Sequence, residues 1–257
     1  MNRRLAVVAP LAATLLLSGC AATPPSPAAH SSAAVQSTAP AAPDSATPTP
    51  TTPAFRRDAH STSDPTSIWV IANKKHPLQP ADYAPTDLVR PDMRNVNGQP
   101  VRQVIAPALA QMLAAAAQSG LQFQLQSGYR SYATQVSVYN AIVASSGRAA
   151  ADTSSARPGF SEHQTGLAVD LSAYPASCTL QACFAGTPQG TWLAANAYRY
   201  GFVLRYPEGK EQITGYTYEP WHYRYVGTQL AAEMHATGTQ TLEEFFGVTG
   251  GDYANAG

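Results

Sequence analysis

The sequence predicts an α+β domain with a small, mostly antiparallel sheet flanked by helices. Two observations support this class. Apolar runs of strand length alternate with helical patterns along residues 67–247, and the connections around the later runs are too short or irregular for the crossover helices of a parallel sheet. The length of 257 residues allows one domain of ordinary size with further segments outside it.

The first half of this domain is expected to contain two strands and two helices. Residues 68–72 are apolar and rich in β-branched and aromatic side chains, which favours a strand or an extended segment. Residues 101–118 are rich in alanine, and their apolar side chains recur at helical spacing before Gly120. Residues 121–126 alternate apolar side chains with glutamine, as expected for a strand with one face in the core. Residues 132–146 return to helical spacing.

The second half is expected to hold three strands and three helices. The expected strands are 167–169, 201–206 and 218–226, and the expected helices are 190–200, 228–236 and 241–246. Gly166 lets the chain turn before the first strand, and Gly227 ends the third. The helix at 190–200 would bury Trp192, Leu193 and Ala197.

Residues 1–20 are typical of an export signal. Arg3 and Arg4 supply a positive start, and the apolar run from Leu5 to Leu17 is too short to span a bilayer as a mature helix. The run ends in Leu-Ser-Gly-Cys, which resembles the bacterial lipobox, so we predict a lipoprotein signal peptide and a lipid anchor on Cys20. The expected location is extracytoplasmic, anchored to the bacterial cell membrane. A soluble secreted protein is the alternative.

Residues 21–66 are predicted to be a disordered tether between the leader and the domain at 67–247. Eight of residues 21–54 are proline, and most of the others are alanine, serine or threonine. Such a segment has too little apolar surface to offset the entropy of ordering the chain. The glycine-rich residues 248–257 are expected to be frayed. The formal net charge is zero, whereas a nucleic-acid-binding protein would normally carry a basic face. We therefore do not expect a nucleic-acid partner.

Cys178 and Cys183 enclose a loop of four residues. Outside the cytoplasm such a pair is expected to be oxidised, so we predict a disulfide between them. Two free thiols in a surface loop are the alternative.

Four residues from distant parts of the chain suit a catalytic metal site. His163 and Asp170 flank a short apolar run, and Glu219 and His222 follow far downstream in the segment Glu-Pro-Trp-His. Two imidazoles and one carboxylate suit a zinc ion with an open position for water, beside which Glu219 would act as general base. The alternatives are a loop histidine, a turn or cap aspartate, a core histidine and a surface glutamate. A shared ion is favoured because burying a polar group without a partner costs about 1–3 kcal/mol.

Arg130 follows a predicted strand end and a glycine. Its guanidinium could bind a carboxylate or polarise a scissile carbonyl, although a surface or structural arginine is the alternative. Ser161 and Gln135 are weaker candidates for polar substrate contacts, and Ser161 could equally cap a turn.

Three segments of the chain resemble the zinc D-alanyl-D-alanine carboxypeptidases of the VanY type, in peptidase family M15. The segments are Ser127–Tyr132 with Gln135, Ala156–Asp170, and Glu219–Gly227. They contain the motifs SxHxxGxAxD and ExWH, and this sequence departs from neither. The resemblance covers about residues 68–246 and implies an α+β fold shared with the hedgehog signalling domain.

The resemblance also implies the roles of the site residues. It implies one zinc ion per chain held by His163, Asp170 and His222, with Glu219 as catalytic base and Arg130 as the group that binds and polarises substrate. The implied reaction removes the C-terminal D-alanine from peptidoglycan stem peptides, and we expect a monomer. The family also contains L,D-carboxypeptidases that trim tetrapeptides to tripeptides with the same catalytic set, and the sequence does not separate the two. A lipoprotein that binds peptidoglycan without cutting it is disfavoured because the ligands, base and arginine are all present.

Overall fold

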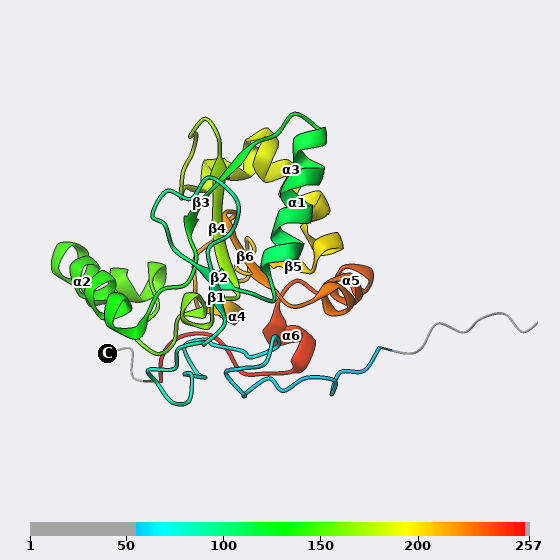
Figure 1. Cartoon of the computed structure of the whole chain (residues 1–257). Coiled ribbons are helices and arrows are strands. Elements are labelled where there is room, and N and C mark those ends of the chain that lie inside the picture. Colours follow the sequence, from blue (N-terminus) through cyan, green and yellow to red (C-terminus); the bar gives the residue numbers. More distant parts are fainter. Residues whose placement is uncertain (1–54, 255–257) are drawn as a thin grey trace, which may run out of the picture. The chain divides into compact units, whose positions relative to one another are not determined.

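A computed structural model describes residues 55–254 of the chain (Figure 1). Its centre is a four-stranded antiparallel sheet with the order β3-β4-β6-β5. The strands are β3 (Phe123–Ser127), β4 (Ala168–Ala173), β5 (Phe202–Leu204) and β6 (His222–Tyr225). A second, two-stranded sheet pairs β1 (Leu88–Val89) with β2 (Val101–Arg102). The predicted α+β class with a small antiparallel sheet is confirmed.

Six α-helices and three 3-10 helices surround the sheet in the described part of the chain. The α-helices are α1 (Ala106–Gln118), α2 (Tyr132–Ser154), α3 (Pro188–Asn196), α4 (Glu211–Thr214), α5 (Thr228–Thr237) and α6 (Leu242–Phe246). The 3-10 helices are η1 (Glu162–Thr165), η2 (Ala182–Gly186) and η3 (Ala197–Tyr200). Figure 1 shows α1 and α3 on one side of the sheet and α2 on the other.

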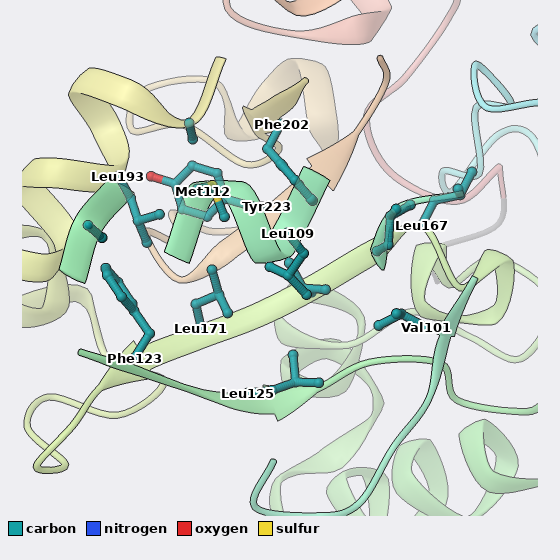
Figure 2. Close-up of a cluster of buried hydrophobic side chains, with 14 of the residues drawn as sticks. Val101, Leu109, Met112, Phe123, Leu125, Leu167, Leu171, Leu193, Phe202 and Tyr223 are labelled. Carbon is teal, nitrogen blue, oxygen red and sulfur yellow. The ribbon is translucent and has the colours of Figure 1, made fainter. Parts of the chain in front are cut away.

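The alternation of side chains along β4 gives the sheet one apolar and one polar face. Val169 and Leu171 belong to the main core, together with Leu109 and Met112 of α1 (Figure 2). Burying side chains of this size stabilises the fold by about 1.5–3 kcal/mol each. Asp170 lies between the two core residues of β4 and therefore points to the opposite face. The strand pattern thus places polar side chains on the face that α1 does not cover.

Several elements differ from their predicted extents, among them three in the first half of the domain. Residues 68–72 are largely buried but form no strand. The β-bridge next to them is an isolated one, between Asn73 and His76. The first helix begins at Ala106, not at residue 101, with proline in its first turn, a position that proline favours. The second helix continues past residue 146 to Ser154, although Gly147 interrupts it with a φ of 81°.

The folded domain begins before residue 67, so the predicted end of the tether at residue 66 is wrong. The Phe55 ring stacks on Trp69 with 5.7 Å between centroids and meets Phe245 edge to face at 5.6 Å. An aromatic side chain next to a segment rich in proline, alanine and threonine gave no periodic signal, so this packing was not predictable from local sequence.

The predicted fraying of residues 248–257 is also wrong for the residues that the structure describes. Tyr253 is only 6% exposed, and its hydroxyl accepts a hydrogen bond from the backbone N of Arg157 at 2.7 Å. The backbone N of Gly251 donates to the Ile213 carbonyl at 2.7 Å. The segment around Gly251 and Tyr253 is therefore held by long-range contacts that its glycine content conceals.

The predicted leader at residues 1–20, the lipidation of Cys20 and the tether up to residue 54 lie outside the described residues. Among the helices of residues 55–254, none combines the length and the apolar character needed to cross a membrane.

Candidate metal centre and active site

The structure brings the three predicted metal ligands together from three elements. His163 lies in η1, whose C-terminal cap is Gly166 with a φ of 68°. Asp170 and His222 are paired directly across β4 and β6. A side chain at Gly166 would meet Arg102 at 2.9 Å, so both its conformation and its surroundings require glycine. One donor atom from each of the three ligands lies within 4.8 Å of the others.

The donor atoms face a common point between the side chains. His163 Nε2 lies 3.2 Å from Asp170 Oδ2, and His222 Nδ1 lies 3.0 Å from Asp170 Oδ1. The other ring nitrogen of His163, Nδ1, lies 2.8 Å from the Gly128 carbonyl, to which it donates. This hydrogen bond leaves Nε2 unprotonated and free to bind a metal. The three residues are at most 6% exposed, and their donor set of two nitrogens and one carboxylate fits a divalent ion such as Zn²⁺.

The second nitrogen of His222 faces a residue that the sequence reasoning missed. Among residues 55–254, His222 Nε2 has no hydrogen-bond partner within 3.5 Å, and it lies 3.6 Å from Glu162 Oε2. A carboxylate behind a metal-binding histidine fixes the ring and its tautomer. The signal for Glu162 was its position directly before a predicted ligand, but only the fold shows that it faces the other histidine.

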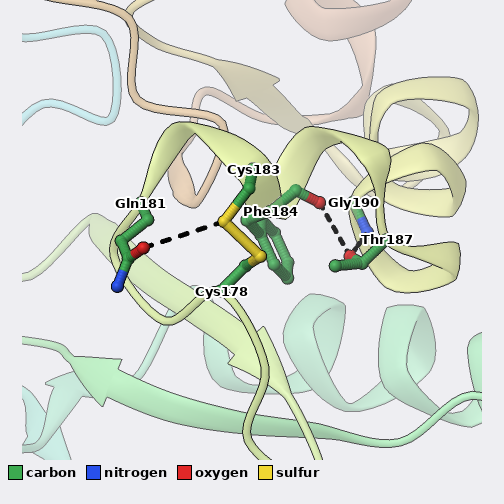
Figure 3. Close-up of a disulfide and its surroundings, with 6 residues drawn as sticks. All are labelled: Cys178, Gln181, Cys183, Phe184, Thr187 and Gly190. Atoms are coloured by element: carbon green, nitrogen blue, oxygen red, sulfur yellow. Dashed lines mark hydrogen bonds between the residues drawn. A yellow bond between two sulfur atoms is a disulfide. The ribbon is translucent and has the colours of Figure 1, made fainter.

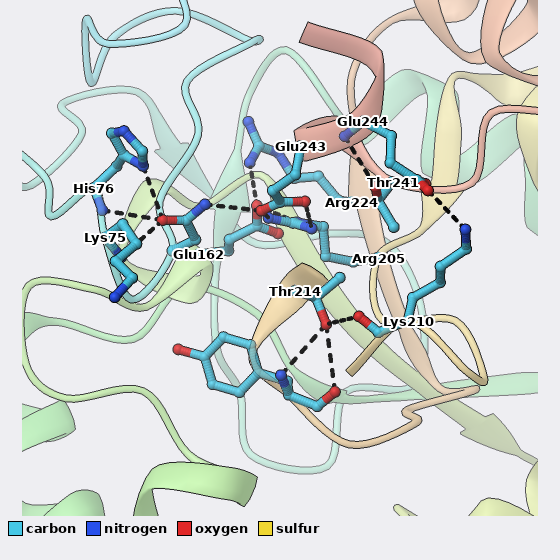
Figure 4. Close-up of polar contacts among 12 residues, drawn as sticks. Lys75, His76, Glu162, Arg205, Lys210, Thr214, Arg224, Thr241, Glu243 and Glu244 are labelled. Atoms are coloured by element: carbon cyan, nitrogen blue, oxygen red, sulfur yellow. Dashed lines mark hydrogen bonds and ion pairs between the residues drawn. The ribbon is translucent and has the colours of Figure 1, made fainter. Parts of the chain in front are cut away.

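Glu162 belongs to a fully buried cluster of four charged side chains, the buried ion cluster (Figure 4). Arg205 Nε donates to Glu162 Oε1 at 2.8 Å, and its two terminal nitrogens donate to Glu243 at 2.8 and 2.6 Å. Arg224 Nη1 donates to the same Glu162 oxygen at 2.7 Å. Burial alone would raise the pKa of Glu162, but the two guanidinium groups outweigh it and hold this pKa well below its usual value.

Glu219 and Arg130 lie at the same site. Glu219 Oε2 is 3.8 Å from His222 Nδ1, the nitrogen that faces Asp170. Burial raises the pKa of Glu219 to about 8, and the nearby Asp170 adds to this effect. Burial lowers the pKa of Arg130, whose Nε has no partner within the described residues. An unpaired, buried guanidinium NH beside a metal site is a suitable donor for an anionic or carbonyl group of a ligand.

A cavity of about 380 Å³ connects these groups, a volume within the range of small-ligand pockets. Arg130, His163, Asp170, Glu219 and His222 all line it. The predicted contact residue Ser161 lines it too and is 4% exposed.

The prediction that Gln135 contacts substrate needs correction. Gln135 is fully buried and is not among the residues that line the cavity. Its amide donates to the Ala156 carbonyl at 2.6 Å and to Ser155 Oγ at 3.2 Å, which ties α2 to the loop before η1.

The predicted disulfide between Cys178 and Cys183 is present, with 5.5 Å between the two Cα atoms (Figure 3). Phe184, directly after the second cysteine, is fully buried and anchors the end of the loop in the core. Leu180, inside the loop, is exposed and lines the cavity. The disulfide loop, residues 178–183, is therefore part of the cavity wall.

The protonation of His222 gives a testable pH dependence of metal binding. Burial would lower its pKa, but Asp170 and Glu162 outweigh burial and raise it to about 9, whereas burial lowers the pKa of His163. A ligand imidazole must be neutral, so metal binding below pH 9 displaces the His222 proton. We expect the affinity for Zn²⁺ to rise by at least about tenfold per unit between pH 6.5 and 8, because any proton that Glu219 loses on metal binding adds to that of His222. Competition with a chromophoric chelator, corrected for the chelator's own protonation, measures this, and a flat profile would contradict a protonated His222.

Comparison with known proteins places the chain in a family. The family model described as VanY, D-alanyl-D-alanine carboxypeptidase, matches residues 98–228. YodJ of Bacillus subtilis, a protein provisionally named as a carboxypeptidase, is 42% identical over 188 residues, which cover 71% of this chain and 68% of that protein.

Solved structures agree with this match. The LD-carboxypeptidase LdcB, whose structure was described as revealing the basis of peptidoglycan recognition, has a TM-score of 0.66 and 41% identity, covering 72% of this chain and 88% of LdcB. A mutant of the VanY D,D-pentapeptidase from a VanB-type vancomycin resistance cassette, solved in complex with Zn(II), has a TM-score of 0.57 and 34% identity, covering 68% of this chain and 97% of that one. The segment matched by the family model contains all five candidate catalytic residues. The chain therefore belongs to the VanY family of D-alanyl-D-alanine carboxypeptidases.

Proposed function

We propose that this protein is a zinc-dependent carboxypeptidase that removes the C-terminal D-alanine from peptidoglycan stem peptides. The observation that carries the proposal is the convergence of three buried donors, His163, Asp170 and His222, with Glu219 and Arg130 on one cavity. Family membership and this donor set support the predicted zinc cofactor. The preference for peptides that end in D-alanyl-D-alanine is the more detailed part of this proposal.

In this reaction the protein's own residues position the peptide and move one proton. A zinc ion held by the three donors would polarise the scissile carbonyl and lower the pKa of the attacking water. Glu219 takes the proton of that water and returns it to the amine of the departing D-alanine. Arg130 binds the terminal carboxylate or the carbonyl oxygen through its guanidinium, whose Nε has no partner among residues 55–254. The Gly128 carbonyl and Glu162 hold the two imidazoles in their working orientation.

A second candidate is an L,D-carboxypeptidase that trims tetrapeptides to tripeptides. The observation that favours it is the likeness to LdcB, which has a higher TM-score and identity than the D,D-pentapeptidase described above. The ligands, base and arginine are the same in both candidates, so only the rest of the cavity can distinguish their substrates. A lipoprotein that binds peptidoglycan without cutting it is disfavoured by the complete catalytic set.

Product analysis on paired substrates tests the proposal. We expect the purified zinc-loaded protein to release D-alanine from a stem pentapeptide, to lose this activity after dialysis against a chelator, and to regain it with added Zn²⁺. D-alanine release from the tetrapeptide but not the pentapeptide would establish the L,D alternative. A zinc-loaded protein that cleaves neither peptide would contradict a carboxypeptidase function.

We also propose that the enzyme acts outside the cytoplasm, anchored through a lipidated Cys20. The leader pattern of residues 1–20 supports this location, and the disulfide at Cys178 and Cys183 is typical of an oxidising compartment. Mass spectrometry of the mature N-terminus tests it, because an unmodified Cys20 or a leader that is still attached would contradict the lipid anchor.

A further inference from the structure

The disulfide loop, residues 178–183, faces both the solvent and the catalytic cavity. Cys183 is exposed, and Cys178 is half-buried and packs against the main core. Leu180, between them, is 43% exposed and lines the cavity that contains the candidate metal ligands. A reagent in solution can therefore reach the disulfide at Cys183, while Leu180 of the same ring forms part of the cavity wall.

Few other interactions hold this loop in place. Its backbone hydrogen bonds run from Gln181 N to the Cys178 carbonyl at 3.2 Å and from Phe184 N to the Gln181 carbonyl at 2.9 Å. Among residues 55–254, no backbone hydrogen bond joins the loop to a segment beyond the adjoining η2. The loop is thus fixed at its two ends by the core contacts of Cys178 and Phe184, and between them by the disulfide.

The backbone inside the ring adopts a conformation that needs a constraint. Leu180 and Cys178 have φ angles of 51° and 48°, and they are the only non-glycine residues with positive φ among residues 55–254. This conformation is unfavourable for a residue with a Cβ and persists only where the surrounding structure imposes it. Because the loop has no backbone hydrogen bonds to the rest of the domain, the disulfide supplies that constraint. Once the ring opens, we expect the backbone to relax and Leu180 to leave the cavity wall.

We propose that the disulfide between Cys178 and Cys183 is a redox switch that sets the shape of the cavity wall, so that the oxidised enzyme binds peptide more tightly than the reduced one. This inference rests on the proposed function and adds a regulation of the same site. The co-reactant is a dithiol. One of its thiolates attacks the exposed sulfur of Cys183, and Cys178 leaves as a thiolate. The second thiol then attacks the mixed disulfide and releases Cys183. Two electrons and two protons pass from the dithiol to the two cysteines, and the dithiol becomes a disulfide.

The switch acts on peptide binding and not on the chemical step. His163, Asp170 and His222 lie on η1, β4 and β6, and Glu219 lies in the segment before β6, so none of them belongs to the loop. The metal donors and the base therefore stay in place when the ring opens, whereas the peptide loses the part of the wall that Leu180 forms. A contact that is lost equally from the bound substrate and the transition state raises KM and leaves kcat unchanged.

Kinetics of the oxidised and the reduced enzyme test the switch. The zinc-loaded full chain is assayed for D-alanine release from a stem pentapeptide and a tetrapeptide, before and after treatment with dithiothreitol and its removal without air. Thiol labelling counts the free cysteines, and metal analysis gives the zinc content in both states. On reduction we expect KM for the better substrate to rise by about fivefold or more with kcat within about twofold, and reoxidation to restore the lower KM.

Three results would overturn the proposal: a disulfide that dithiothreitol does not reduce in the folded protein, a KM that stays within about twofold after complete reduction, or a fall in kcat without a rise in KM. An oxidised, zinc-loaded enzyme that cleaves neither peptide would instead refute the proposed function.

The double variant Cys178→Ser with Cys183→Ser separates the switch from a direct effect of the reductant. It cannot form the ring, so it should show the higher KM of the reduced enzyme both with and without dithiothreitol. Any effect of the reductant on the bound zinc would appear in this variant as well. A folded double variant with the KM of the oxidised wild type would contradict the proposal.

The variant Leu180→Gly tests whether Leu180 is the group that the switch moves. Glycine accepts positive φ without strain, so the ring can keep its shape while the side chain on the cavity wall is removed. We expect Leu180→Gly to show the raised KM already when oxidised and to change little on reduction. A further rise of about fivefold on reduction would contradict this role of Leu180. Val104 is 40% exposed and does not line the cavity, so Val104→Ala is the matched control and should keep both the low KM and the response to dithiothreitol.

Discussion

Replacing Glu219 with glutamine is expected to lower kcat by about 10³-fold while zinc remains bound, because general bases of this kind contribute about 10²–10⁴-fold. The amide has nearly the shape of the carboxylate, so the cavity stays intact, but it cannot accept the proton of the attacking water. Glu219 Oε2 lies 3.8 Å from His222 Nδ1, close enough to the donor atoms to serve a water between them. D-alanine release gives kcat, and metal analysis after dialysis gives the zinc content per chain.

The pH profile of the same variant gives an independent measurement. Burial raises the pKa of Glu219 to about 8 in the metal-free site, and a bound divalent cation would lower it again by favouring the carboxylate. The acidic limb of kcat/KM in the wild-type enzyme should therefore lie below pH 8, and it should be absent in Glu219→Gln. Glu208→Gln is the matched control, because Glu208 is exposed and lies outside the cavity. Activity of Glu219→Gln within severalfold of wild type, or loss of its zinc, would contradict the assignment of Glu219 as base.

The candidate catalytic residues could be proposed from the sequence because their chemistry and immediate sequence context are local. His163, Asp170, Glu219 and Arg130 each stand beside a glycine, an apolar run or a strand end that the sequence displays directly. The direct pairing of Asp170 with His222 could not be predicted, because the register between β4 and β6 depends on contacts between segments about 50 residues apart. The same limit explains why Gln135 was wrongly predicted to contact substrate. Its buried amide donates to residues about 20 positions further along the chain.

The buried ion cluster shows a second limit of the sequence. Charged residues are almost never fully buried unless they are paired, so a single sequence gives no reason to place Arg205, Glu162 and Glu243 in the interior. Their partners lie about 40 residues away or more, in separate segments of the chain. The early start of the domain at Phe55 and the ordered end at Tyr253 have the same cause, since both depend on packing against distant side chains.

Replacing Arg205 with methionine is expected to lower the free energy of unfolding by about 3–5 kcal/mol, because it removes one partner from a buried charge cluster. The methionine side chain fills much of the same space. Glu243, however, loses both guanidinium hydrogen bonds and, among the described residues, keeps only the side-chain bond from the Asn73 amide. Glu162 keeps Arg224, so the larger cost falls on Glu243. Denaturant titration of the metal-free protein measures the change without a contribution from bound zinc.

Two comparisons distinguish a buried unpaired charge from the loss of any ion pair near α6. Lys210 donates to Glu244 of α6 at 2.7 Å, but both side chains are partly exposed, so Lys210→Met should cost less than about 1 kcal/mol. The double variant Arg205→Met with Glu243→Met removes the stranded carboxylate and should recover part of the loss, since apolar side chains can replace buried ion pairs. Because Glu162 faces His222, the cluster joins the stability of the fold to the metal centre. If Arg205→Met were no less stable than Lys210→Met, the prediction that a stranded buried Glu243 carboxylate destabilises the fold would be wrong.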